Sequence, residues 1–247
     1  MTPSPVCEVS PDSVDTAHCY YCCMRTGDGG WSAVRELADR QFGLFTTAQA
    51  RERGVAAYEL ARMAHRDLIM RVHHGVYEVP ESDAWMTFGD WAAQWLALHP
   101  AADIESRRAD PDCVISHAAA AQMLRLGTIT ASGLELSGPH RINVRDHTVR
   151  TWRRPIGERG RDWDLVDGLP VTTPRRTITD LLMSYGDGGH LGTALHTCLT
   201  EELLDVAELT ALCERAAPRW DHTSGEDLVS SLLQQAQMPT TAGATAR

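Results

Sequence analysis

Residues 46–65 read T-T-A-Q-A-R-E-R-G-V-A-A-Y-E-L-A-R-M-A-H, and their spacing predicts a helix-turn-helix. Thr46 or Thr47 can cap a short first helix. Gly54 follows that helix, at a position that favours a residue able to adopt a positive φ. A second helix is predicted over residues 56–65. Because a helix-turn-helix places its second helix in the major groove, this stretch predicts a protein that binds DNA.

The second predicted helix has one face suited to DNA. If Leu60 points into the core, Tyr58, Arg62 and His65 fall on the opposite face. Arginine can bind guanine with two hydrogen bonds, and tyrosine can contact a phosphate or a thymine methyl group. The alternative is an ordinary solvated face on a three-helix domain. The candidate DNA-binding residues are Thr47, Gln49, Tyr58, Arg62, His65, Arg66, Arg71, His73 and His74.

Two β-rich runs flank the turn at 73–75 and predict a hairpin. A further helix is predicted over residues 31–41. Three helices followed by a hairpin form a winged helix, so residues 31–80 are predicted to be a DNA-binding domain of this kind. We expect Arg71, His73 and His74 near the tip of the wing, within reach of phosphates or a minor groove. Simple exposure is the alternative, and metal binding is disfavoured because no third ligand lies nearby in the sequence.

The composition excludes several classes of protein. A length of 247 residues suits two domains, and the net charge of −10 argues against indiscriminate binding of nucleic acid. All 23 basic residues are arginine, so enzymes that need a lysine in a phosphate loop, a Schiff base or a nuclease site are excluded in their usual forms. We find no apolar run near the roughly 20 residues of a membrane span and no secretory signal, which favours a cytoplasmic protein.

Residues 1–30 are expected to form a flexible leader that contains cysteines. Cys19 and Cys22 make half of a zinc site, but the remaining candidates are irregularly spaced, so no metal is predicted. Translation could begin at Met1 or at Met24. Residues 239–247 are expected to fray.

Residues 84–238 are predicted to form a larger mixed α+β domain, so the fold class is α+β. Ser116 is expected to cap a helix, and Thr173 followed by Pro174 marks another helix start. The segment 107–112 is expected to be a loop. The predicted helices are 84–99, 117–126, 174–185, 191–200, 206–216 and 226–237, and the predicted strands are 114–115, 140–145, 149–153, 163–166 and 169–171.

Arginines concentrate in the middle of this second domain, where residues 141–161 hold seven of them. They could form a second nucleic-acid surface or a docking site for an acidic protein, and a solvated sheet face is the alternative. Arg176 and Asp180 lie four residues apart, which favours an ion pair within one helix. The candidate partner-binding residues are Arg141, Arg145, Arg150, Arg153 and Arg154.

The sequence offers little for catalysis. It contains no nucleophile elbow, zincin helix or phosphate loop. The segment 110–112 resembles a nuclease fragment but lacks its lysine. His117 follows an apolar strand and could act as a base, although such a histidine more often caps or packs. We therefore expect no enzymatic activity, no catalytic residues and no cofactor.

The order of these parts resembles a known family. S-H-A-A-A at 116–120 and G-L-P-V-T-T-P-R-R-T from Gly168, with Asp180 beyond it, are similar to the AbiEi-like antitoxins of bacterial abortive-infection toxin–antitoxin systems. The G-L-F-T-T run from Gly43 supports the resemblance, which covers about 31–217. It implies a winged-helix protein that represses its own operon and counteracts a nucleotidyltransferase-like toxin. The alternatives are a stand-alone repressor with a ligand-sensing C-terminal domain and a remnant nuclease.

Overall fold

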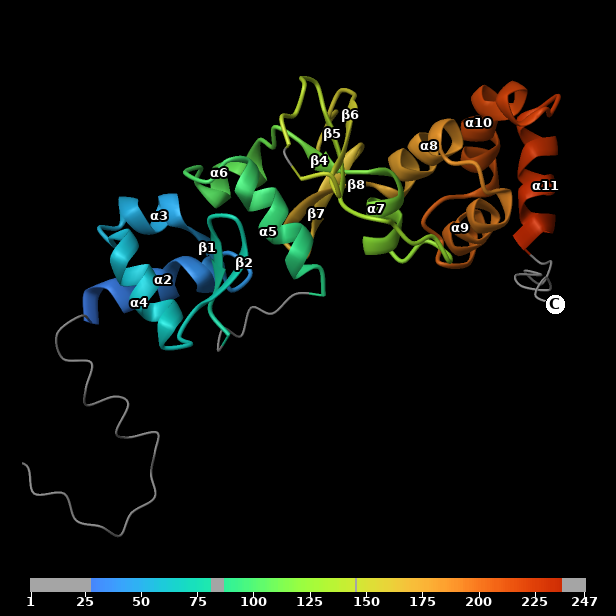
Figure 1. Ribbon diagram of the computed structural model, residues 1–247. Coiled ribbons are helices and arrows are strands. Elements are labelled where there is room, and N and C mark those ends of the chain that lie inside the picture. Colours follow the sequence, from blue (N-terminus) through green and yellow to red (C-terminus); the bar gives the residue numbers. More distant parts are fainter. Residues whose placement is uncertain (1–27, 81–86, 145, 237–247) are drawn as a thin grey trace, which may run out of the picture.

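The computed structural model describes residues 28–80, 87–144 and 146–236, which form two packed units (Figure 1). The fold is α+β. The predicted leader cysteines, Arg145 and the predicted frayed tail lie outside the described residues.

The first unit is a winged helix. Its sheet has the order β1-β3-β2 with antiparallel pairing throughout. The sequence predicted the hairpin but not the third strand, which pairs Phe45 with Tyr77. The elements are α2 (Asp28–Arg40), β1 (Leu44–Thr46), α3 (Thr47–Glu52), α4 (Ala57–His65), β2 (Met70–His73) and β3 (Val76–Glu78).

Local signals fix the helix-turn-helix as predicted. The Thr46 side chain accepts a hydrogen bond from the backbone of Gln49, and the Gln49 side chain accepts one from the backbone of Thr46. This reciprocal pair satisfies two backbone donors at the start of α3. Gly54 has a φ of +81°, as the turn requires. Ala50 and Leu60 are buried in the core between the helices.

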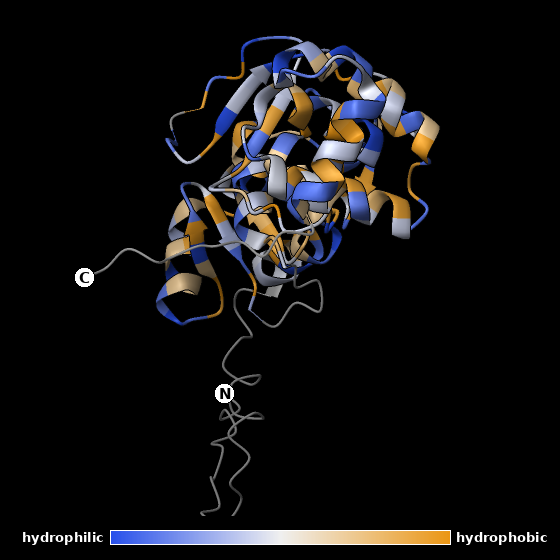
Figure 2. Cartoon of the chain, turned by 90° about the vertical axis from the view of Figure 1, so that its right-hand side faces the viewer, coloured by the Kyte–Doolittle hydropathy of each residue, from blue (hydrophilic) through white to orange (hydrophobic). Residues whose placement is uncertain are grey.

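The second unit has a five-stranded mixed sheet in the order β6-β5-β4-β8-β7. Its helices α8 to α11 pack around a separate apolar core beyond the sheet. The helices at this end of the molecule carry both hydrophobic and hydrophilic residues (Figure 2). The elements are α5 (Gly89–Leu98), α6 (Ile104–Ala109), β4 (Val114–Ile115), α7 (His117–Met123), β5 (Glu135–Gly138), β6 (Arg150–Arg153), β7 (Trp163–Val166), β8 (Leu169–Thr172), α8 (Pro174–Ser184), α9 (Gly188–Thr200), α10 (Val206–Ala216), the 3-10 turn η1 (Ala217–Trp220) and α11 (Gly225–Ala236).

Two predicted segments differ from the structure. The expected loop at 107–112 begins inside α6, because the Asp103 side chain caps this helix by accepting from the Ser106 amide. Residues 140–144 form no strand, and β5 pairs in parallel with β6 instead. Leu134 and Leu136 are fully buried, so the apolar residues that face the core lie in and beside β5 rather than in residues 140–144.

Arg108 contacts both units and connects them. Its guanidinium donates to the carbonyl oxygens of Gly168 at 3.0 Å and Arg40 at 3.4 Å, and it lies over the Phe42 ring. Gly168 has a φ of +76°, and a Cβ there would lie 2.8 Å from both the Arg108 guanidinium and the Phe42 ring. The glycine of the G-L-P-V-T-T-P motif is therefore required by a tight turn that also receives the arginine.

Candidate nucleic-acid interface and a buried polar cluster

Helix α4 exposes the face that the sequence predicted for DNA. Leu60 is buried, whereas Tyr58 on the opposite side is 70% exposed. Arg62, His65 and Arg66 are also exposed, and within the described part of the chain no ion pair or hydrogen bond engages the Arg62 side chain. A guanidinium without a protein partner is available for base edges or phosphates.

The wing places two more polar side chains at the surface. Arg71 and His74 are exposed, and the Arg71 guanidinium lies 2.9 Å from the His74 Nδ1. The wing is also tied to the helix-turn-helix, because the half-buried Thr47 donates its amide to the Gly75 carbonyl at 2.9 Å. Residues from the wing and the start of α3 therefore hold fixed relative positions. Their contact with DNA stays a prediction.

Two candidate DNA contacts face the protein instead. Gln49 is buried, and it bonds the Gln41 side chain at 2.7 Å and the Ala102 carbonyl at 3.1 Å. It serves as a helix cap and as a link to the second unit, so we correct its assignment as a DNA contact. His73 is half-buried, with its Nε2 3.6 Å from the Asp146 carboxylate of the second unit. The strand alternation of the wing turns this side chain away from the tip.

Charge on the winged helix is balanced overall. Residues 28–80 hold seven arginines and seven acidic residues, so long-range attraction to a polyanion is weak. Arg53 is paired with Glu36 at 3.3 Å. Any binding of DNA by this unit would therefore depend on the exposed groups of α4 and the wing rather than on net charge.

The arginines of the second unit divide into two kinds. Arg141 and Arg153 are exposed and, among the described residues, have no carboxylate partner. Arg150 lies 3.5 Å from the Glu135 carboxylate, and Arg154 lies 3.6 Å from that of Asp180. The predicted partner surface is thus only partly free, because two of its members neutralise carboxylates.

The predicted ion pair between Arg176 and Asp180 is confirmed at 3.0 Å. Asp180 is 2% exposed and also receives Arg154, so two guanidinium groups share one buried carboxylate. Burial raises the pKa of Asp180, and the two arginines oppose that shift. A buried charge with two partners is a structural element of this unit rather than a free acid.

His117 lies in the same region and is 1% exposed. Burial, reinforced by Arg154, Arg176 and Arg150, lowers the pKa of His117 to about 3, so the imidazole is neutral at pH 7. The expected cap of α7 by the Ser116 side chain is wrong. The Glu135 carboxylate takes that place and accepts from the Ala118 amide at 2.7 Å. Because Glu135 comes 17 residues after Ala118 in the chain, no local sequence pattern predicts this contact.

The described cysteines offer no reactive thiol. Cys113, Cys198 and Cys213 are free and buried, and burial raises their pKa values to about 12, 11 and 12 respectively. Across residues 28–80, 87–144 and 146–236, no cluster of three or more His, Cys, Asp or Glu could hold a metal. In those same ranges no helix is long and apolar enough to span a membrane.

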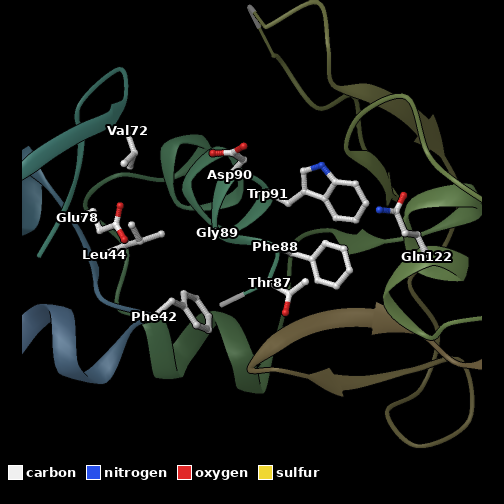
Figure 3. Close-up of a pocket in the computed structure, with 10 residues that line it drawn as sticks. All are labelled: Phe42, Leu44, Val72, Glu78, Thr87, Phe88, Gly89, Asp90, Trp91 and Gln122. Atoms are coloured by element: carbon white, nitrogen blue, oxygen red, sulfur yellow. The ribbon is translucent and has the colours of Figure 1, made fainter. Parts of the chain in front are cut away.

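A cavity of about 500 Å³ lies where the wing meets α5 (Figure 3). Its walls are aromatic and aliphatic, with the stacked rings of Phe88 and Trp91 on one side. Glu78 and Asp90 add carboxylates to the lining. The cavity is therefore amphipathic and touches both units.

Comparison with known proteins supports the identity of the first unit. Residues 32–80 match the family model described as a transcriptional regulator, AbiEi antitoxin. No curated protein matches the chain significantly. Among solved structures, the chain is similar to the crystal structure of the RV2827C protein from Mycobacterium tuberculosis, with 18% identity, coverage of 85% of this chain and 83% of that chain, and a TM-score of 0.42. A likeness at this level carries no argument about fold or function.

Proposed function

We propose, from the match of residues 32–80 to the AbiEi antitoxin regulators, that this protein is an antitoxin that represses its own operon. Its winged helix would bind operator DNA, and its second unit would counteract a toxin of the nucleotidyltransferase type. We further propose that it acts in the cytoplasm and is not an enzyme.

The observation that carries the DNA-binding part is the exposed face of α4. Tyr58, Arg62 and His65 lie on the side opposite the buried Leu60, and the wing with Arg71 follows in the chain. In this arrangement α4 would enter the major groove and Arg71 of the wing would contact the flanking backbone.

The proposal for the toxin depends on the free arginines of the second unit. Arg141 and Arg153 offer unpaired guanidinium groups to an acidic protein surface. Reversal of both charges would test this without touching the ion pairs of Glu135 and Asp180. We expect Arg141→Glu with Arg153→Glu to weaken rescue of growth from the toxin while operator binding is kept.

The DNA-binding part is tested with the full chain and duplex DNA from the region upstream of its own gene. Wild type should bind that duplex more tightly than a shuffled duplex of equal length, as measured by fluorescence anisotropy at fixed salt. Arg62→Ala should lose the preference. Arg219→Ala is a matched control, because Arg219 is exposed on η1 and makes no described ion pair. Equal affinity of wild type for both duplexes would disprove operator recognition.

A second candidate function is a stand-alone repressor that senses a ligand. The observation in its favour is the cavity between the wing and α5, which touches both units (Figure 3). Identification of the adjacent gene separates the two candidates, since an antitoxin is expected beside a toxin gene. Rescue of growth by the chain when the neighbouring gene product is expressed would decide for the antitoxin.

A further inference from the structure

The two sequence motifs of the second unit meet in one buried polar cluster. S-H-A-A-A begins at Ser116, between β4 and α7, whereas the second motif supplies Arg176 and Asp180 on α8. Arg154, just after β6, completes the group by pairing with Asp180. DNA binding by the winged helix uses none of these residues.

His117 is the least satisfied member of this cluster. Its backbone has a φ of +55°, a value that residues other than glycine rarely adopt. Its ring stacks on Trp152 with centroids 4.1 Å apart. Its Nε2 is buried and has no hydrogen-bond partner. Strain and an unpaired polar atom at one residue point to a role that packing does not explain.

The hydrogen bonds on the other side of the ring favour one tautomer, because Ser137 and the His117 Nδ1 are the described partners of the Ser116 Oγ. The Ser137 hydroxyl donates to the Ser116 Oγ at 2.8 Å, so Ser116 keeps its own proton to donate. The Ser116 Oγ lies 2.8 Å from the His117 Nδ1, which accepts that proton in the hydrogen bond. A neutral imidazole that accepts at Nδ1 carries its proton at Nε2. The unpaired atom is therefore a donor.

A cavity of about 150 Å³ adjoins this histidine. Arg150 and the Tyr185 side chain also line it, and the Tyr185 hydroxyl makes no hydrogen bond with other described residues. The Glu135 carboxylate in the lining is already engaged, because its Oε2 accepts from the amides of Ala118 and Ala119 and its Oε1 lies 3.5 Å from the Arg150 guanidinium. The donors around the cavity thus exceed the free acceptors.

We propose that this cavity binds a small oxyanion, the carboxylate or phosphate group of a low-molecular-weight ligand. Arg150 would share its charge between Glu135 and the anion, and the His117 Nε2 and the Tyr185 hydroxyl would donate hydrogen bonds. The volume of about 150 Å³ admits a small acid or an inorganic anion. The proposal depends neither on operator binding nor on a toxin.

Thermal unfolding of the full chain with three probes at constant ionic strength tests the site. The probes are acetate, inorganic phosphate and acetamide, which is the neutral isostere of acetate. A ligand of the folded state raises the Tm in a saturable way. We expect saturation with acetate or phosphate and none with acetamide. The anion that saturates at lower concentration identifies the ligand group as a carboxylate or a phosphate.

Two neighbouring arginines on β6 give a matched pair of variants. Arg150→Gln should weaken the apparent Kd of the effective anion by about tenfold or more, the size expected for a hydrogen bond to a charged group. Arg153→Gln should leave it within about twofold, because Arg153 is exposed and outside the cavity lining. Nitrogen chemical shifts of the histidine rings, assigned with His117→Asn, should move at Nε2 of His117 on saturation. The proposal is overturned if no anion saturates, if acetamide acts equally, or if both glutamine variants bind like wild type.

Discussion

Arg62 on α4 and Arg176 on α8 carry the same guanidinium group into opposite settings. Arg62 is exposed and has no carboxylate partner among the described residues, whereas Arg176 shares the buried Asp180 with Arg154. The first arginine is available to a polyanion, and the second holds the fold. An arginine in a sequence motif is therefore not automatically a binding residue, and its carboxylate neighbours decide between the two roles.

Of the variants that test this comparison, the loss of Asp180 is expected to have the largest effect, and that effect is on stability. Asp180→Ala should lower the free energy of unfolding by about 3 kcal/mol, because it leaves Arg154 and Arg176 without their shared partner. Urea denaturation measures the change. The control is Asp164→Ala, which removes an exposed pair with Arg159 at 3.1 Å and should cost less than about 1 kcal/mol. Similar losses in both variants would contradict the distinction between buried and exposed pairs.

The neutral state of His117 predicts a pH dependence. Its pKa in the folded protein is about 3, against 6.5 for an unperturbed histidine, so between these values the unfolded chain binds a proton that the folded chain does not. Stability should therefore fall as pH drops from about 6.5 towards 3, by up to about 1.4 kcal/mol per pH unit from this group. Chemical denaturation of wild type and His117→Asn at several pH values measures the difference in slope. Parallel curves for the two proteins would refute the assignment.

Arg62→Ala tests the other half of the comparison, the role of the exposed arginine on the winged helix. It should weaken operator binding by about 1–3 kcal/mol and relax sequence preference, the size of a bidentate contact with guanine. Its unfolding should match wild type, because no described partner is lost. Anisotropy titrations with operator variants provide the measurement. Unchanged affinity for every sequence would remove α4 from the role of recognition helix.

Arg71→Ala on the wing should give the smallest effect. The expected result is a uniform loss of affinity across DNA sequences, with a slope of log K against log salt reduced by about one unit. Titrations at several salt concentrations test it. A change in sequence preference without a change in the salt slope would instead assign Arg71 to a base.

The winged helix could be predicted because its signals are local. Thr46, Gly54 and Leu60 lie within one short stretch, and each acts through a cap, a turn or a helical period. The three-residue β1 carried no comparable signal, since it is defined by pairing with β3. Gln49 was misassigned because its face was judged without the capping bond that turns it inward.

The polar cluster of the second unit was only partly predictable. The ion pair of Arg176 with Asp180 follows from a spacing of four within one helix. The engagement of Arg154 by the same carboxylate required the sheet and α8 to pack together, which no sequence period encodes. Alternation at 140–144 resembled a strand, but a strand also needs a neighbour with free backbone groups, and β6 pairs with β5.

The contacts of Arg108 have a geometric consequence for any assembly on DNA. Its guanidinium holds the end of α2 through Arg40 and the β7–β8 turn through Gly168. Those anchor points set the direction in which the second unit projects from the winged helix. A protein bound to the second unit would therefore lie at a fixed angle to the DNA axis. Its position along the DNA would depend on where α4 binds.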